Sequence, residues 1–201
     1  MDIVTLLVQR FRNAMDCANK AGGFSGIACF NNFPRGSCGD TCYLLAEFLL
    51  EHDIYSEYVE GMKYPQSHAW LVIANKKDLD RKRNTKSSSV YDDEFDGSSN
   101  GYEFIINAIE KGSISNLEYI SPDYSSELIG RTIIDITGDQ FYNDPEFLYY
   151  NKPVYVGEMD EFHSLFEIRN VHECNGLEGV GAFNSYRLRS LYKIIKKYID
   201  E

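Results

Sequence analysis

The sequence of 201 residues predicts one α+β domain. Two observations predict this class: several segments repeat their apolar residues with a helical period, and others have the alternation or the β-branched composition of strands. No internal repeat divides the chain, and a single polar stretch at residues 76–101 interrupts the pattern. We therefore expect one domain over residues 1–201 with an insertion at 76–101.

Three segments are predicted helices with an apolar face. The first, from Ile3 to about Lys20, ends before Gly22-Gly23, where helix propensity falls. The second begins near Cys38 and ends around His52-Asp53, because leucine and phenylalanine recur there at helical spacing. The third, from Asn184 to Ile199, closes the chain.

Strands are predicted on both sides of the insertion. Residues 54–61 and 67–74 alternate in hydropathy, and residues 131–137 are rich in the β-branched residues that favour strands. Residues 154–180 are expected to hold two further strands joined by loops.

The insertion at 76–101 joins a basic block, a serine run and an acidic block without apolar periodicity. Such a polyampholyte composition is typical of a mobile loop. It serves either as a lid or partner-docking loop or as a plain solvated insertion. Because the basic block adjoins the acidic one, it is a poor nucleic-acid site. A further helix is predicted at 102–111.

The whole chain is acidic, with 31 Asp and Glu against 20 Lys and Arg and a net charge of −11. Phosphate backbones repel such a protein, so we expect no nucleic-acid partner. No run approaches the ~18 consecutive apolar residues of a membrane span, and the first residues lack the pattern of a signal peptide. Five cysteines at irregular spacings do not indicate a disulfide framework. We expect a cytoplasmic protein with free thiols; a secreted effector without a cleavable signal is the alternative.

Three residues in predicted regular elements have the chemistry of nucleophilic catalysis. Cys38 lies in the first turn of its helix, where unpaired backbone amides and the helix dipole favour a thiolate. His68 lies within a strand, and Asp135 lies among isoleucines in another, where burying a carboxylate is costly without a partner. The imidazole is a suitable partner, since a carboxylate orients and supports an imidazolium. Each residue alone also fits a structural role, but the three together predict a nucleophile, a base and an orienting group.

The residues around these positions resemble a known enzyme family. Gly36-Ser37-Cys38-Gly39-Asp40 opens a helix, Ser67-His68-Ala69-Trp70 lies in a strand, and Ile134-Asp135-Ile136-Thr137 lies in another. In this order they resemble the transglutaminase-like branch of the papain-like cysteine hydrolases, over about residues 33–75 and 131–141. The resemblance implies a papain-like core, in which the nucleophile helix packs on an antiparallel β-sheet, with a catalytic triad of Cys38, His68 and Asp135.

The resemblance also implies an activity, the attack of the Cys38 thiolate on an amide bond of a protein or peptide. A protease or deamidase results when water accepts the acyl group, and a transglutaminase or other amine acyltransferase results when an amine accepts it. A non-catalytic binding module that keeps the fold is a further alternative. No cofactor is implied. The interval between His68 and Asp135 is longer than in the family pattern, so Asp139 is a second candidate for the carboxylate.

Three further residues are candidates for contact with the substrate or the triad. Papain-like enzymes place a side-chain amide six positions before the nucleophile, which implies that Asn32 and the Cys38 backbone amide bind the oxyanion. Trp70 shares a strand face with His68, so it shields the histidine–aspartate pair, lines the substrate cleft or packs as an ordinary core residue. Gln140, just after the aspartate strand, is either a substrate-facing amide or a turn residue.

A metal site is the first alternative to a thiol nucleophile. Two loose groups of possible ligands are Cys38, Cys42 and His68, and His163, His172 and Cys174. Structural zinc sites usually contain two close cysteine pairs of the Cys-x-x-Cys type, which this sequence lacks. We therefore predict no metal ligand.

Overall fold

The computed structural model describes residues 2–77, 79–80, 124 and 126–199. The chain divides into two units, Met1–Leu79 with Asp123–Glu201, and Asp80–Pro122; the second lies almost wholly outside the described residues. The insertion predicted at 76–101 begins in helical conformation at Lys76 and Lys77. From residue 81 onward it lies outside the described residues, as does the helix predicted at 102–111.

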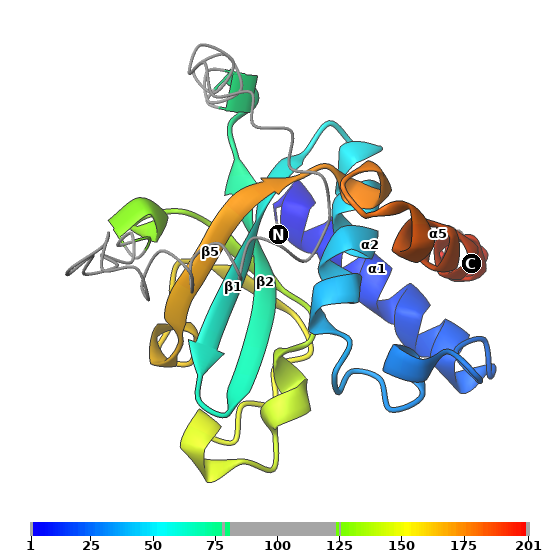
Figure 1. Ribbon diagram of the computed structural model, residues 1–201, viewed down its shortest axis with the longest axis horizontal. Helices are drawn as coiled ribbons and strands as arrows, with labels where there is room; N and C mark the ends of the chain where they lie inside the picture. Colours follow the sequence, from blue (N-terminus) through cyan, green and yellow to red (C-terminus); the bar gives the residue numbers. More distant parts are fainter. Residues whose placement is uncertain (1, 78, 81–123, 125, 200–201) are drawn as a thin grey trace, which may run out of the picture. The chain divides into compact units, whose positions relative to one another are not determined.

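Five strands form one antiparallel sheet in the order β4-β3-β2-β1-β5. In the β1–β2 hairpin, Gly61 pairs with His68. The short strands β3 and β4 continue the sheet beyond β2, while β5 pairs with the other edge of β1 (Figure 1). The strands are β1 (Tyr55–Lys63), β2 (Gln66–Ala74), β3 (Ile133–Asp135), β4 (Tyr155–Gly157) and β5 (Glu167–Cys174). The mixed helix and strand content and the antiparallel sheet are as predicted.

Three helices gather on one side of the sheet (Figure 1). They are α1 (Ile3–Lys20), α2 (Cys38–Leu50) and α5 (Ala182–Lys196). The starts of α1 and α2 are those that the apolar periodicity predicts, whereas α5 begins at Ala182 rather than Asn184. The rings of Phe11 on α1 and Phe48 on α2 stack at 5.2 Å, within the core that joins the helices to the sheet.

The two faces of β2 are covered by different layers. Ala69 and Leu71 point toward the helices, while Trp70 and Val72 point to the opposite face, as the strand period predicts. On that opposite face, aromatic residues from the segment after β3 form a second core. They include Phe141, Phe147, Tyr150, Phe162 and Phe166. His68 belongs to this second face, since its ring contacts Phe141, Phe162 and Phe166.

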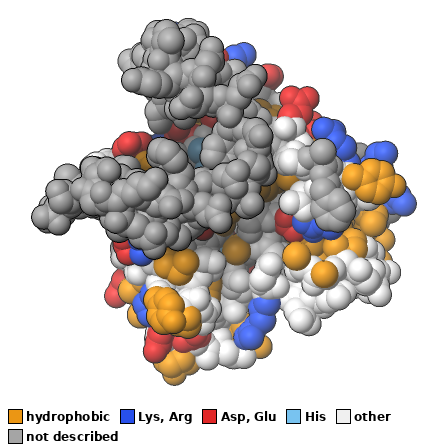
Figure 2. All heavy atoms as spheres, in the orientation of Figure 1, with side chains coloured by type: hydrophobic (Ala, Val, Ile, Leu, Met, Phe, Trp, Pro, Cys, Tyr) orange, Lys and Arg blue, Asp and Glu red, His pale blue; other side chains and the backbone are white. Residues whose placement is uncertain are grey.

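Within the described part of the chain, no helix combines the length and the apolar composition needed to cross a bilayer. On the face that Figure 2 shows, the coloured Lys and Arg side chains are scattered among acidic and hydrophobic ones.

Candidate active site

Cys38 is the first residue of α2, and contacts on both sides hold it there. The buried Ser37 precedes it, with a hydroxyl that donates to the carbonyl of Pro34 at 2.8 Å. Asp40, in the first helical turn, accepts two hydrogen bonds from the Arg187 guanidinium of α5 at 2.7 and 2.9 Å. The thiol is therefore fixed at the end of the helix where the dipole favours an anion.

The thiol of Cys38 interacts electrostatically with the side chain of His68. Burial raises the pKa of this thiol, but the hydrogen bond and charge of His68, with the backbone N–H of Ala69, outweigh it and leave the pKa below its ordinary value. Burial instead raises the pKa of the Cys42 thiol well above its ordinary value and that of Cys174 to about 12. Of these three thiols, Cys38 alone is prepared to ionise.

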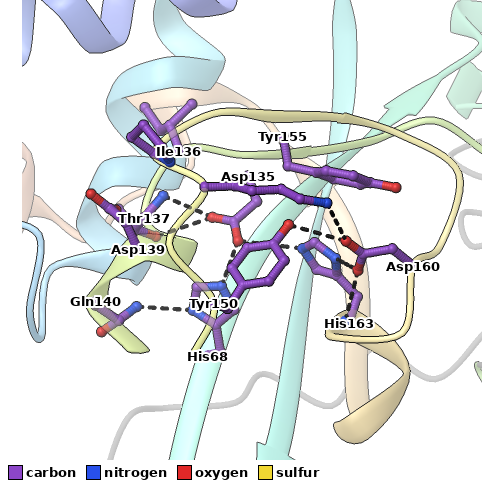
Figure 3. A network of polar contacts seen from close by, with 12 residues as sticks. His68, Asp135, Ile136, Thr137, Asp139, Gln140, Tyr150, Tyr155, Asp160 and His163 are labelled. Atoms are coloured by element: carbon purple, nitrogen blue, oxygen red, sulfur yellow. Dashed lines mark hydrogen bonds and ion pairs between the residues drawn. The ribbon is translucent and has the colours of Figure 1, made fainter. Parts of the chain in front are cut away.

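His68 and Asp135 form a buried pair between β2 and β3 (Figure 3). Since an ionised carboxylate only accepts, the His68 Nε2–H donates to Asp135 Oδ2, at 2.8 Å. The other carboxylate oxygen accepts from the backbone N–H and hydroxyl of Thr137, at 2.8 and 3.3 Å. Burial opposes both charges, but the pairing outweighs it, raising the pKa of His68 to about 9 and holding that of Asp135 well below its usual range.

Asp139, the second candidate for the carboxylate, is engaged elsewhere. Its two oxygens accept hydrogen bonds from the Arg12 guanidinium of α1, at 3.0 and 2.8 Å. Arg12 is buried and also donates to the backbone carbonyls of Ile136 and Pro153. Asp139 thus ties the segment after β3 to α1, and Asp135 is the carboxylate that pairs with the histidine.

Gln140 links the loop before α2 to the imidazole. Its Oε1 accepts from the backbone N–H of Gly36 at 3.3 Å, and its Nε2 lies 3.1 Å from Nδ1 of His68, to which it donates when the imidazole is neutral (Figure 3). In the neutral form of His68, Nδ1 carries a lone pair. The Gln140 amide and the Cys38 thiol then compete as donors to this nitrogen. The sequence left two roles open for Gln140, a substrate-facing amide and a turn residue. In the structure its side chain instead connects the backbone of Gly36 to the ring of His68.

Replacing Gln140 with alanine is expected to increase the rate at which iodoacetamide alkylates Cys38 at pH 6, by about fivefold. The amide stabilises the neutral imidazole, and one such hydrogen bond contributes about 1 kcal/mol net. Gln66→Ala is the matched control, because the Gln66 side-chain amide donates to Asp144 at the exposed hairpin end, and to no other residue that the structure describes. A slower alkylation of Cys38 in Gln140→Ala would show that the amide supports the ion pair instead.

A second histidine lies on the other side of Asp135. His163 is fully buried, and its Nε2 lies 3.3 Å from Oδ2 of Asp135, the oxygen that His68 also contacts. Its Nδ1 lies 2.6 Å from Oδ1 of Asp160, which also accepts from the His163 backbone N–H at 3.0 Å (Figure 3). No local sequence pattern indicated this pair, because the segment between β4 and β5 carries it to the site without regular periodicity.

Trp70 covers the histidine–aspartate pair from the side. Its indole is fully buried and lies 5.6 Å from the His68 ring and 5.2 Å from the His163 ring, between centroids. Gly61 on β1 makes room for it, since a Cβ there would approach the indole to 2.8 Å. The sequence left three roles open for Trp70. Its complete burial agrees with shielding of the histidine–aspartate pair and with core packing, but not with lining a substrate cleft.

Gly138 is required by a close approach to Asp135. A Cβ at this position would lie 2.7 Å from Oδ2 of Asp135 and 2.6 Å from the ring of Tyr150. We expect Gly138→Ala to lower the free energy of unfolding by about 2 kcal/mol and to slow alkylation of Cys38 at pH 6, because the carboxylate is displaced. Gly179→Ala is the control, as its nearest neighbour is 3.5 Å away. Urea unfolding measures the loss of stability, and mass spectrometry measures the alkylation of Cys38. An unchanged alkylation rate in Gly138→Ala would contradict the role of Asp135 in activating the thiol.

Asn32, the side-chain amide expected at the oxyanion, lies exposed in the turn before α2. Its backbone carbonyl accepts from the N–H of Arg35 at 2.8 Å. In the part of the chain that the structure describes, its side chain forms no hydrogen bond with Cys38 or His68. Its role at the oxyanion therefore stays a prediction.

Neither loose group of metal ligands is assembled as the sequence suggested. Cys174 joins the helix-side core, whereas His163 lies on the opposite face of the sheet. Among the described residues, the one close group of potential ligands is His68, Asp135 and His163, with ligand atoms within 4.8 Å of one another. Within this group, His68 Nε2–H donates to Asp135 Oδ2 at 2.8 Å, and His163 Nε2 lies 3.3 Å from the same oxygen.

Comparison of the chain with family models, with curated proteins and with solved structures finds no match.

Proposed function

We propose that this protein is a cysteine hydrolase that cleaves amide bonds of a protein or peptide substrate, as a protease or a deamidase with a papain-like core. The observation that carries the proposal is the line of contacts from Cys38 through His68 to Asp135. A thiol at a helix N-terminus, an imidazole and a buried carboxylate are the groups that this chemistry requires. No cofactor enters the proposed reaction.

The reactive form is a thiolate on Cys38 beside an imidazolium on His68. The pKa of the thiol is lowered, and that of the imidazole is raised to about 9. Both shifts favour the charged forms, a thiolate and an imidazolium, over the neutral pair. Asp135 holds the imidazole through Nε2, which leaves Nδ1, 3.1 Å from the Gln140 amide, as the nitrogen that exchanges a proton with the sulfur in the proposed reaction.

In the first step, the thiolate of Cys38 attacks the carbonyl carbon of the substrate amide and forms a C–S bond. The tetrahedral intermediate then loses its C–N bond, and the Nδ1 proton of His68 passes to the leaving amine or ammonia. In the second step, water gives a proton to His68 and attacks the thioester. The C–S bond breaks, which releases a carboxylic acid and restores the thiolate and the imidazolium.

The oxyanion needs donors beside the sulfur. The Cys38 backbone N–H is one, since the first amides of a helix have no intrahelical partner. Asn32 is the second candidate, from the turn that leads into α2. Removing such a donor typically costs about 3 kcal/mol of transition-state stabilisation.

The identity of the acceptor separates the proposed hydrolase from its alternatives. Water gives proteolysis or deamidation, an amine gives transglutaminase or another acyltransferase activity, and a binding module gives no product. The test is incubation with a mixture of denatured and native proteins, with and without a primary amine, followed by mass spectrometry. We expect new chain termini or glutamine converted to glutamate with the wild type and none with Cys38→Ala. Products that persist in Cys38→Ala would contradict the proposal.

A further inference from the structure

The contacts that support Asp135 extend beyond the three residues of the proposed mechanism. Oδ2 of Asp135 faces the Nε2 atoms of both His68 and His163, at 2.8 and 3.3 Å. The far nitrogen of His163, Nδ1, lies 2.6 Å from Asp160. One carboxylate therefore lies between two imidazoles, and the second imidazole lies between two carboxylates (Figure 3).

The position of the protons on His163 follows from these partners. Asp160 is ionised, because hydrogen bonds from His163 and Tyr150 outweigh burial and hold its pKa well below its usual range. An ionised carboxylate only accepts, so Nδ1 of His163 carries a proton. In the neutral ring Nε2 would then turn a lone pair toward Oδ2 of Asp135. A proton on Nε2 removes this repulsion and makes the contact an ion pair at 3.3 Å. Among the described residues, this buried atom has no hydrogen-bond partner that would compete for the proton.

We infer that His163 is a positioning residue of the proposed active site, held as an imidazolium between Asp160 and Asp135 so that it orients Asp135 and moderates the negative charge presented to His68. The inference rests on the proposed function. Burial lowers the pKa of His163, but the two carboxylates outweigh it and raise the pKa above its ordinary value.

The other groups around His163 agree with this assignment. The Tyr150 hydroxyl donates to Asp160 Oδ2 at 3.1 Å, and the Lys152 ammonium lies 3.4 Å from the same oxygen. The Tyr155 ring lies 5.1 Å from the imidazole of His163, and its hydroxyl donates to the Glu158 carbonyl. The described charges that face the ring directly are thus Asp135 on β3, Asp160 on its own segment and His68 on β2.

This arrangement has a consequence for the acid step. The rings of His68 and His163 are 6.5 Å apart between centroids. At an effective dielectric constant of ~20, a unit charge at this distance changes a pKa by about two units. The cation on His163 therefore keeps His68 less basic than Asp135 alone would make it. A less basic His68 gives up its proton more readily to a leaving amine.

The test is a histidine titration by NMR, which the four histidines of the chain make tractable. In the wild type we expect both ring nitrogens of His163 to stay protonated from pH 6 to pH 8. In His163→Gln, which keeps a donor but loses the charge, we expect the pKa of His68 to rise by one to two units. Asp160→Asn should shift it in the same direction, because the neutral amide no longer holds the proton on His163. His52→Gln, at an exposed histidine, should leave it unchanged.

A neutral His163 in the wild type at pH 7 would overturn the inference. So would a pKa of His68 that stays the same in both His163→Gln and Asp160→Asn, even if both variants are less stable. If one variant does not fold, the wild-type titration still decides. The result is separable from the proposed function: slow alkylation of wild-type Cys38 at pH 6 would contradict the hydrolase, whereas the ring protons of His163 are observed whether or not Cys38 reacts.

Discussion

His68→Ala slows the alkylation of Cys38 by iodoacetamide at pH 6 by tenfold or more. Of the influences on this thiol, burial raises its pKa, and the hydrogen bond and charge of His68 provide most of the opposing effect. Without the imidazole, burial prevails and the pKa rises above its ordinary value. Even an ordinary thiol, with a pKa of ~8.5, is only about 0.3% ionised at pH 6. Peptide mapping by mass spectrometry measures the labelling of each cysteine separately.

His52→Ala controls for the loss of a histidine, because His52 is exposed on the turn after α2. Its labelling pattern should match that of the wild type. An equal rate at Cys38 in wild type and His68→Ala would show that the thiol is not activated by the imidazole. In that event a non-catalytic binding module becomes the better account of the fold.

Asp135→Asn removes the carboxylate from the buried pair and lowers both reactivity and stability. Burial lowers the pKa of His68, and Asp135 is what raises it to about 9, so the variant loses the imidazolium near neutral pH. Breaking a buried pair in this way costs about 3 kcal/mol. For a chain of this size, that lowers Tm by about 10 °C. Calorimetry and Cys38 alkylation measure the two losses.

The stability difference between wild type and Asp135→Asn should depend on pH. The lowered pKa of Asp135 contributes stability above pH ~4, which is lost as the pH falls through its folded value. The raised pKa of His68 contributes stability that is complete below pH ~6.5 and lost as the pH rises through about 9. The difference is thus largest between about pH 4 and 6.5. Asp139→Asn is the control, since it breaks the pair with Arg12 and should not alter the alkylation of Cys38.

The parts of the site that lie in regular elements could be predicted from the sequence. Helical periodicity places Cys38 at the start of α2, and the strand period places His68 on the face of β2 that bears Trp70. The isoleucines around Asp135 indicate a buried strand, and burial of its carboxylate calls for a partner. For each of these three residues, local secondary-structure propensity and the cost of burying a polar group are sufficient to predict its position.

The rest of the site depends on chain segments without a regular period. Gln140 lies in a short turn after β3, and His163 and Asp160 lie between β4 and β5. Their approach to His68 and Asp135 is decided by the packing of the second aromatic core, which no spacing in the sequence reveals. For the same reason, the sequence alone associates His163 with His172 and Cys174, its neighbours along the chain, rather than with Asp135.

The most direct test of the central claim is the pH dependence of Cys38 alkylation in the wild-type protein, followed from pH 5 to pH 9 with limiting iodoacetamide. We predict that Cys38 is labelled first at pH 6, ahead of the exposed Cys17 and Cys29 and the buried Cys42 and Cys174. Its labelling should reach half of its plateau below the ~8.5 of an ordinary thiol. Labelling of Cys38 no faster than that of Cys17 and Cys29 at pH 6 would contradict an activated thiolate, and with it the proposed hydrolase.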